Sequence, residues 1–168
     1  MAFRHDARLS LYQYFSNIGL NLGARISPST ANFRDFLSQT TQTPLEFHPL
    51  AADELKAVVH SFNSYKASGV DNIPMRIIKL SIDIIVEPLT EIIHLSLVSG
   101  SFPDTLKIAR VLPIFKTGDP EQLENYRPIS TLPGFSKLYE KVVYNRIYKY
   151  LKNHNLKSSY VYGIDSVG

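Results

Sequence analysis

The strongest restriction on how this chain folds lies between Val111 and Ser130, where two apolar segments flank a polar loop. The segments at 108–115 and 127–130 contain β-branched residues, which favour strands, and each contains a proline, which favours a sheet edge. The residues from Lys116 to Pro120 include Gly and Asp as well as Pro, a composition typical of turns. The pattern predicts one small antiparallel sheet built from 108–115 and 127–130.

Apolar periodicity predicts that the rest of the chain is mainly helical, so the expected fold class is α+β with helix dominant. The expected helices include one that ends near Pro28 and others at about 53–62, 75–99 and 133–153. Pro88 removes a backbone hydrogen bond from the third of these, so we expect a kink or a new helix start there. Gly100 is suited to end that helix as its C-terminal cap.

Two cations stand at the ends of the predicted strands. Lys116 follows the first strand and Arg127 begins the second. A guanidinium group can hold phosphate oxygens in a bidentate manner, whereas an ammonium group acts as a point charge. The pair therefore forms a candidate clamp for a polyphosphate. The alternative is that both cations only keep two edge strands soluble.

The same stretch carries a family resemblance. Residues 126–130 read Tyr-Arg-Pro-Ile-Ser, and a proline and a lysine precede them at a strand end. This resembles the fingers of reverse transcriptases from non-LTR (LINE-type) retrotransposons. Further segments look like motifs of that family and occur in its order, namely 14–19, 66–74, 100–103 and 136–141.

The resemblance implies the fingers and partial palm of a right-hand polymerase, with a small antiparallel sheet. Residues 1–48 are then a linker region preceding the polymerase, and residues 49–168 are a truncated reverse transcriptase domain. It also implies that Lys116 and Arg127 bind the triphosphate of a deoxynucleotide. The implied template or primer contacts are Lys66, Gly69, Ile129 and Ser130.

The loop at 66–74 has two interpretations. In the family it borders template and primer, so Lys66 would contact a phosphate. Alternatively, it is an ordinary turn between two helices, capped by Asp71. In either case Gly69 permits a left-handed backbone, and Asn72 tolerates one better than most residues where the family commonly has glycine.

The chain departs from the family in its last residues. The glutamine-tyrosine-glycine-phenylalanine-arginine signature is reduced to Val161–Asp165, and no Tyr-x-Asp-Asp turn follows. The parent family uses Mg²⁺ held by catalytic aspartates. We therefore expect no catalytic residues, no metal ligands and no bound cofactor in this chain. The expected function is an N-terminal fragment of an RNA-directed DNA polymerase that is inactive alone. The alternative is a repurposed small module that binds nucleic acid or a protein.

Charge is distributed unevenly along the chain. Residues 1–100 carry 8 Lys/Arg against 9 Asp/Glu, and residues 101–168 carry 10 against 6. This asymmetry is consistent with weak, non-specific binding of RNA or single-stranded DNA. A solvated helix face would produce the same uneven charge distribution. No segment has a signal-peptide core or the length of a membrane span, and there is no cysteine. We expect an intracellular protein, nuclear or cytoplasmic, without a membrane partner.

Overall fold

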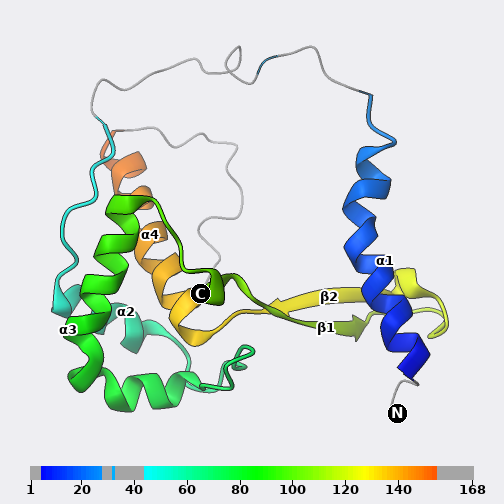
Figure 1. Cartoon of the computed structure of the whole chain (residues 1–168), viewed down its shortest axis with the longest axis horizontal. Coiled ribbons are helices and arrows are strands. Elements are labelled where there is room, and N and C mark those ends of the chain that lie inside the picture. The colour runs from blue at the N-terminus through cyan, green and yellow to red at the C-terminus, as the bar shows by residue number, and fades with distance from the viewer. Residues whose placement is uncertain (1–4, 28–31, 33–43, 155–168) are drawn as a thin grey trace. The chain divides into compact units, whose positions relative to one another are not determined.

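The computed structural model describes residues 5–27, 32 and 44–154 (Figure 1). It has the predicted α+β composition, being mostly helical with a two-stranded antiparallel sheet. Two compact units make up the chain. The first comprises Met1–Thr40 and Val111–Ser130, and the second comprises Thr41–Arg110 and Thr131–Gly168. In the described residues, no helix combines the length and the apolar character that crossing a bilayer requires.

The first unit contains helix α1 (His5–Gly23) and a β-hairpin. The hairpin consists of β1 (Arg110–Phe115), a short 3₁₀ turn η3 (Leu123–Asn125) and β2 (Tyr126–Thr131). Both strands lie within two residues of their predicted bounds. The first strand starts two residues later than expected, and the 3₁₀ turn η2 (Asp104–Lys107) precedes it.

Helix α1 is shorter than the sequence predicted. It ends at Gly23, well before Pro28, and tight backbone turns such as Arg25 N–H to Leu22 O follow it. Glycine is a poor helix former, which accounts for the early end. Apolar residues at one helical face's spacing continue towards Pro28, namely Leu11, Phe15, Ile18, Leu22 and Ile26. Of this apolar stripe only Leu11 is buried, whereas the members from Ile18 onward are exposed.

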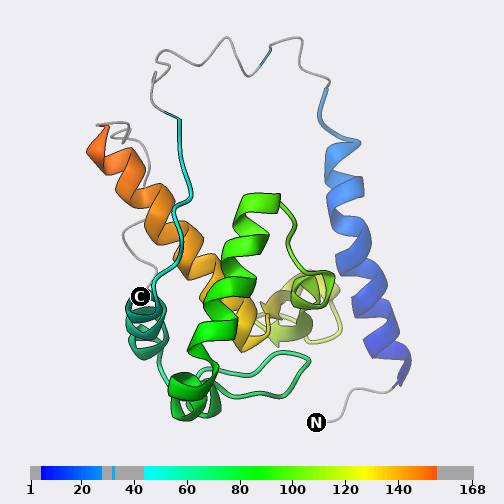
Figure 2. The same cartoon turned by 60° about the vertical axis from the view of Figure 1, so that its left-hand side comes forward.

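The second unit is built around the three remaining helices, α2 (Ala52–Ser61), α3 (Met75–Ser99) and α4 (Gly134–Asn153). All three contact one another, and Figure 2 shows them gathered around one core. The side chains most fully removed from water are Leu55, Val59, Ile78, Ile82, Leu138 and Val142. Burying a side chain of this size stabilises a fold by about 1.5–3 kcal/mol, so this cluster holds the unit together.

Helix α3 continues through Pro88, and Figure 1 shows it bending along its length. A proline inside a helix lacks its N–H and crowds the preceding turn, which is the usual cause of such a bend. The predicted kink is therefore confirmed, and no new helix starts. Gly100 ends α3 in the left-handed conformation, at φ 65°, as expected for a C-terminal cap.

Arg146 fastens the segment before α2 onto α4. Its guanidinium donates to both carboxylate oxygens of Glu54, at 3.2 and 3.0 Å, and to the carbonyl oxygens of His48 and Pro49. One α4 side chain thus holds α2 and the extended residues that precede it.

Candidate functional site

The register of the hairpin decides which side chains share a face. The Lys116 N–H donates to the Asn125 carbonyl oxygen at 2.8 Å, and the Phe115 and Tyr126 rings lie 5.5 Å apart between centroids. Both contacts, together with the strand bounds, place Phe115 opposite Tyr126. Arg127 is consequently opposite Ile114.

Lys116 and Arg127 therefore lie on the same face of the hairpin. Alternate residues of a strand point to one side, so Lys116 shares a side with Ile114 and hence with Arg127. The Cα atoms of such diagonal neighbours on adjacent strands are about 7–8 Å apart, within reach of long side chains. Both cations are exposed, and neither forms an ion pair within the described part of the chain. The arrangement offers two cations to one polyanionic ligand.

Asn125 and Tyr126 order the loop between the strands. The Asn125 amide donates to the Asp119 carbonyl, and the Tyr126 hydroxyl donates to the Pro120 carbonyl, each at 2.9 Å. Gly118 has φ 99°, and any Cβ there would meet the Asn125 side chain at 2.6 Å. The sequence alone predicts neither of these side-chain hydrogen bonds, although asparagine near a turn commonly bonds to local backbone.

The two other hairpin residues singled out from the sequence lie on opposite faces. Ile129 alternates with Arg127 and so shares its face, half exposed. Ser130 points to the other side. The structure thus brings Ile129 together with the two cations and separates Ser130 from them.

The loop at 66–74 belongs to the second unit, and Gly69 has a steric role in it. A Cβ on Gly69 would lie 2.4 Å from the Pro133 nitrogen and 2.6 Å from the Leu132 carbonyl carbon. Gly69 does not have a positive φ, so it does not use the left-handed backbone that glycine permits. Asn72 does adopt that conformation, at φ 57°. Glycine is needed at position 69 because another backbone approaches it closely.

Side chains on both sides hold the same loop. Asn72 accepts a hydrogen bond from the Arg110 guanidinium at 2.9 Å, and Asp71 accepts one from the Ile73 N–H at 3.2 Å. Asp71 does not cap α3, whose N-cap residue is Pro74 without a side-chain hydrogen bond. These hydrogen bonds fix the conformation of the loop, which lies against the start of α4.

One lysine belongs to this turn and another contacts it. The Lys137 ammonium donates to the Ala67 carbonyl at 2.8 Å, and the Lys66 ammonium lies 5.8 Å from the centre of the Phe62 ring. Burial and then the nearby charge of Lys66 lower the pKa of Lys137 from its ordinary value of 10.5. The contact between Lys137 and Ala67 joins residues 70 positions apart, so it arises from the fold.

The described residues do not form a metal centre. Among them, no three His, Asp or Glu side chains come close enough together to hold a cation. The described residues therefore do not provide a cluster of carboxylates that would hold Mg²⁺. The reduced signature at Val161–Asp165 lies outside the described residues.

Known proteins with similar sequences share one description. No protein-family model matches the chain. The "RNA-directed DNA polymerase from mobile element jockey" of Drosophila melanogaster is 32% identical over 67% of this chain, and its counterpart of Drosophila funebris is 32% identical over 66%. The "Probable RNA-directed DNA polymerase from transposon BS" of Drosophila melanogaster is 29% identical over 77%. This chain spans 12–14% of the length of these relatives.

Proposed function

This chain belongs to the RNA-directed DNA polymerases of non-LTR retrotransposons, and we propose that it is the fingers and the start of the palm of such an enzyme. In this proposal residues 1–48 are the linker before the polymerase, and residues 49–168 are the truncated polymerase domain. The hairpin binds the incoming deoxynucleotide triphosphate. The loop at 66–74 and the outer part of β2 contact template or primer.

The hairpin register carries the nucleotide-binding proposal. Two exposed cations on one face, without partners in the described residues, suit a ligand with several negative oxygens. Asn125 and Tyr126 hold the intervening loop in place without using either cation. A binding site arranged before its ligand arrives loses less entropy on binding.

Alanine substitutions test this role. Arg127→Ala should weaken binding of a fluorescent deoxynucleotide triphosphate by about tenfold or more, because a charged bidentate contact is lost. Lys116→Ala should have a smaller effect. Arg25→Ala is the matched control, since it removes an exposed cation of the same unit outside the hairpin. An equal loss in Arg25→Ala would mean that only net charge matters, and the clamp would be rejected.

The contacts proposed for template or primer are Lys66, Gly69, Ile129 and Ser130. Lys66 is an exposed cation of this loop and Lys137 contacts the loop at the Ala67 carbonyl, so the loop offers two cations to a phosphate. Binding to RNA or single-stranded DNA should be weak and independent of sequence, because phosphate contacts carry no base information. Its log–log salt dependence should have a slope of about −0.7 per contact.

Fluorescence anisotropy of a labelled single strand measures this at several salt concentrations. Lys66→Ala should weaken binding and make the slope shallower by one contact. Lys107→Ala, which removes a cation from η2 outside the loop, should leave both unchanged. Salt-independent binding would contradict the electrostatic interpretation, and an unchanged slope in Lys66→Ala would remove Lys66 from the interface.

The proposal also concerns catalysis. The 168 residues contain no Asp-Asp pair, and two-metal phosphoryl transfer depends on carboxylates that hold the ions. We expect this chain to extend no primer in Mg²⁺. A primer-extension gel tests this, and extension above background would overturn it. Nucleic-acid binding that survives both Lys116→Ala and Arg127→Ala would instead favour the alternative of a repurposed binding module.

A further inference from the structure

Helix α3 has a second apolar face that the described part of the chain does not cover. Its inner face carries the buried Ile78 and Ile82 of the core. On the other side, Ile77, Leu80 and Ile84 are 48%, 80% and 83% exposed. Positions spaced by three and four residues follow one stripe of a helix, so these side chains form a continuous ridge. Isolated exposed apolar residues are ordinary, whereas a contiguous patch marks an interaction site.

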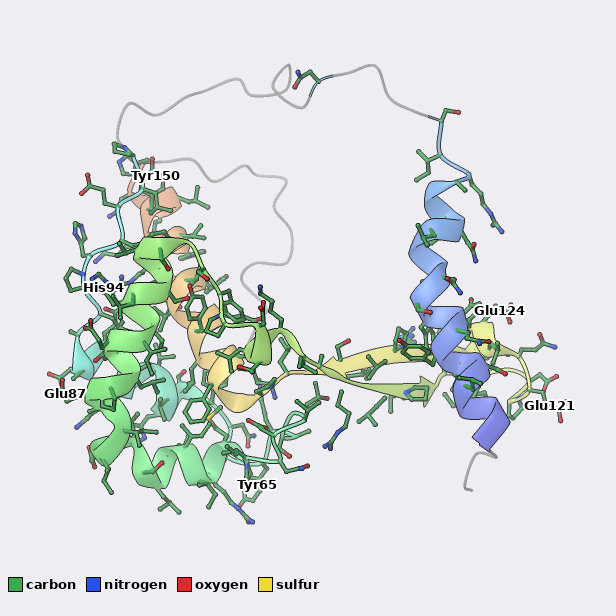
Figure 3. All side chains as sticks on the ribbon, in the orientation of Figure 1. Tyr65, Glu87, His94, Glu121, Glu124 and Tyr150 are labelled. Atoms are coloured by element: carbon green, nitrogen blue, oxygen red, sulfur yellow. The ribbon has the colours of Figure 1, made fainter. Side chains whose placement is uncertain are left out.

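Two charges flank this ridge along the same edge. Arg76 and Glu87 are about three helical turns apart and therefore project in nearly the same direction. Figure 3 labels Glu87 on helix α3. Neither side chain forms an ion pair among the residues that the structure describes. Asp83 also lies along this edge, but it is paired with Lys56 at 2.6 Å.

The positions of these charges are self-complementary. Leu80 and Ile84 are the most exposed members of the ridge, and the midpoint between them falls near residue 82. Arg76 precedes that midpoint by nearly the same distance as Glu87 follows it. If an identical helix is laid antiparallel across this point, Leu80 meets the partner's Ile84 and Arg76 meets the partner's Glu87. A two-fold axis repeats both contacts, as isologous interfaces require.

We propose that two copies of this chain associate through the first half of α3, packed antiparallel about that axis. The segment before Pro88 is unbroken, which allows two such segments to lie along each other. Residues after the bend, such as Leu95 and Val98, take no part. The inference is independent of the proposed nucleotide role, since it uses no residue of the hairpin or of the 66–74 loop.

A second copy fits this surface better than an unrelated protein does. An unrelated partner needs only a complementary face of its own. Binding of an unrelated partner does not require Arg76 and Glu87 to lie at matching distances from the centre of the ridge. Two copies require that symmetry, and the helix has it.

Sedimentation velocity across a range of protein concentrations tests the association. The unmodified 168-residue chain should show a concentration-dependent dimer, and Ile84→Glu should raise the dimer dissociation constant by about a hundredfold or abolish dimers, because it places a carboxylate against the partner's apolar Leu80 at two symmetry-related contacts. Val98→Glu and Leu20→Glu are matched controls, as both replace exposed apolar side chains outside the proposed contact. Circular dichroism checks that every variant keeps its helix content.

A charge swap gives the decisive result. Arg76→Glu and Glu87→Arg should each raise the dissociation constant by about tenfold, since each puts like charges together in two places. The double variant should return it to within about threefold of the original, because the pairs are re-formed in reverse. A chain that stays monomeric at its highest soluble concentration would overturn the proposal. Dissociation caused by Leu20→Glu or Val98→Glu, or a double variant as weak as the singles, would overturn it equally.

Discussion

Gly69 illustrates how a single missing side chain lets two distant parts of the second unit meet. The backbone at Leu132 and Pro133 comes so close that a methyl group would overlap it. Backbone atoms cannot rotate aside as a flexible side chain does, so a larger residue must push the loop away from α4. The position is restricted by space and not by an unusual backbone angle.

Gly69→Ala should therefore destabilise the second unit by about 1–3 kcal/mol, the usual range for overpacking. Gly19→Ala is the control, because no atom lies within 4 Å of its Cβ position and it sits in helix α1. There, alanine should stabilise by about 0.5–1 kcal/mol. Urea denaturation measures both. If Gly69→Ala is neutral, the close approach does not exist in solution.

The fold disfavours the charged form of Lys137. Its pKa is lowered, so between that folded value and 10.5 the folded state binds fewer protons than the unfolded state. The contribution of Lys137 to stability should accordingly rise with pH through this window. Below the window both states are charged, and the full cost of burying the ammonium remains.

Removing the neighbouring cation tests the second cause of this shift. In Lys66→Ala the pKa of Lys137 should rise toward 10.5 but stay below it, since burial is the larger cause and persists. An NMR titration of the lysine Cε or Nζ signals reads this directly. Lys152→Ala, at the far end of α4, should not move the Lys137 titration. A shift in the opposite direction would show that the two ammonium groups do not repel each other.

Arg146 is the contact that joins helix α4 to helix α2 and to the extended segment before α2. Its side chain is only 14% exposed and donates to the Glu54 carboxylate and to two carbonyl oxygens. A planar guanidinium suits this set of acceptors, whereas an ammonium does not match the bidentate geometry.

Arg146→Ala should destabilise the chain by about 2–4 kcal/mol, since charged hydrogen bonds are lost and a partly buried carboxylate is left without its partner. Arg146→Lys should recover little of this. Lys149→Ala, an exposed cation one turn further along α4, should stay within about 0.5 kcal/mol of the original. Thermal and urea unfolding compare the three, and a full rescue by lysine would mean that charge alone is sufficient.

Considered as a whole, the described part of the chain exposes many large apolar side chains. A groove of about 510 Å³ runs along α4, lined chiefly by aromatic and aliphatic side chains: Phe102, Tyr139, Glu140, Val143, Tyr144, Ile147, Tyr148 and Leu151. Exposed patches of this kind favour association or aggregation.

The native chain should therefore bind a dye such as anilinonaphthalene sulfonate before it unfolds. Ile147→Asp should reduce the dye fluorescence at least by half, because it places a charge in the groove. Val98→Asp, an equally polar change on α3 away from the groove, is the control and should reduce it less. Dye binding that is unaffected by Ile147→Asp would place the apolar site elsewhere.

Local chemistry determined the elements of this protein. The spacing of Leu55 and Val59 in α2 and the turn residues after Lys116 each act within a few neighbours, so the sequence predicted α2 and the hairpin correctly. The early end of α1 at Gly23 was missed because the apolar stripe continues past a residue that disfavours helix. Sequence resemblance also identified the family, since its motifs are short and ordered.

The candidate contacts between distant segments depended on the tertiary structure. Gly69 meets Pro133, and the Lys137 ammonium donates to the Ala67 carbonyl, each across more than sixty residues of chain. No local periodicity encodes such a distance, because it results from how α2, α3 and α4 close around their shared core. The same closure buries one apolar face of α3 and leaves Leu80 and Ile84 exposed. From the sequence alone both faces look like core, since each has the helical spacing and only packing distinguishes them.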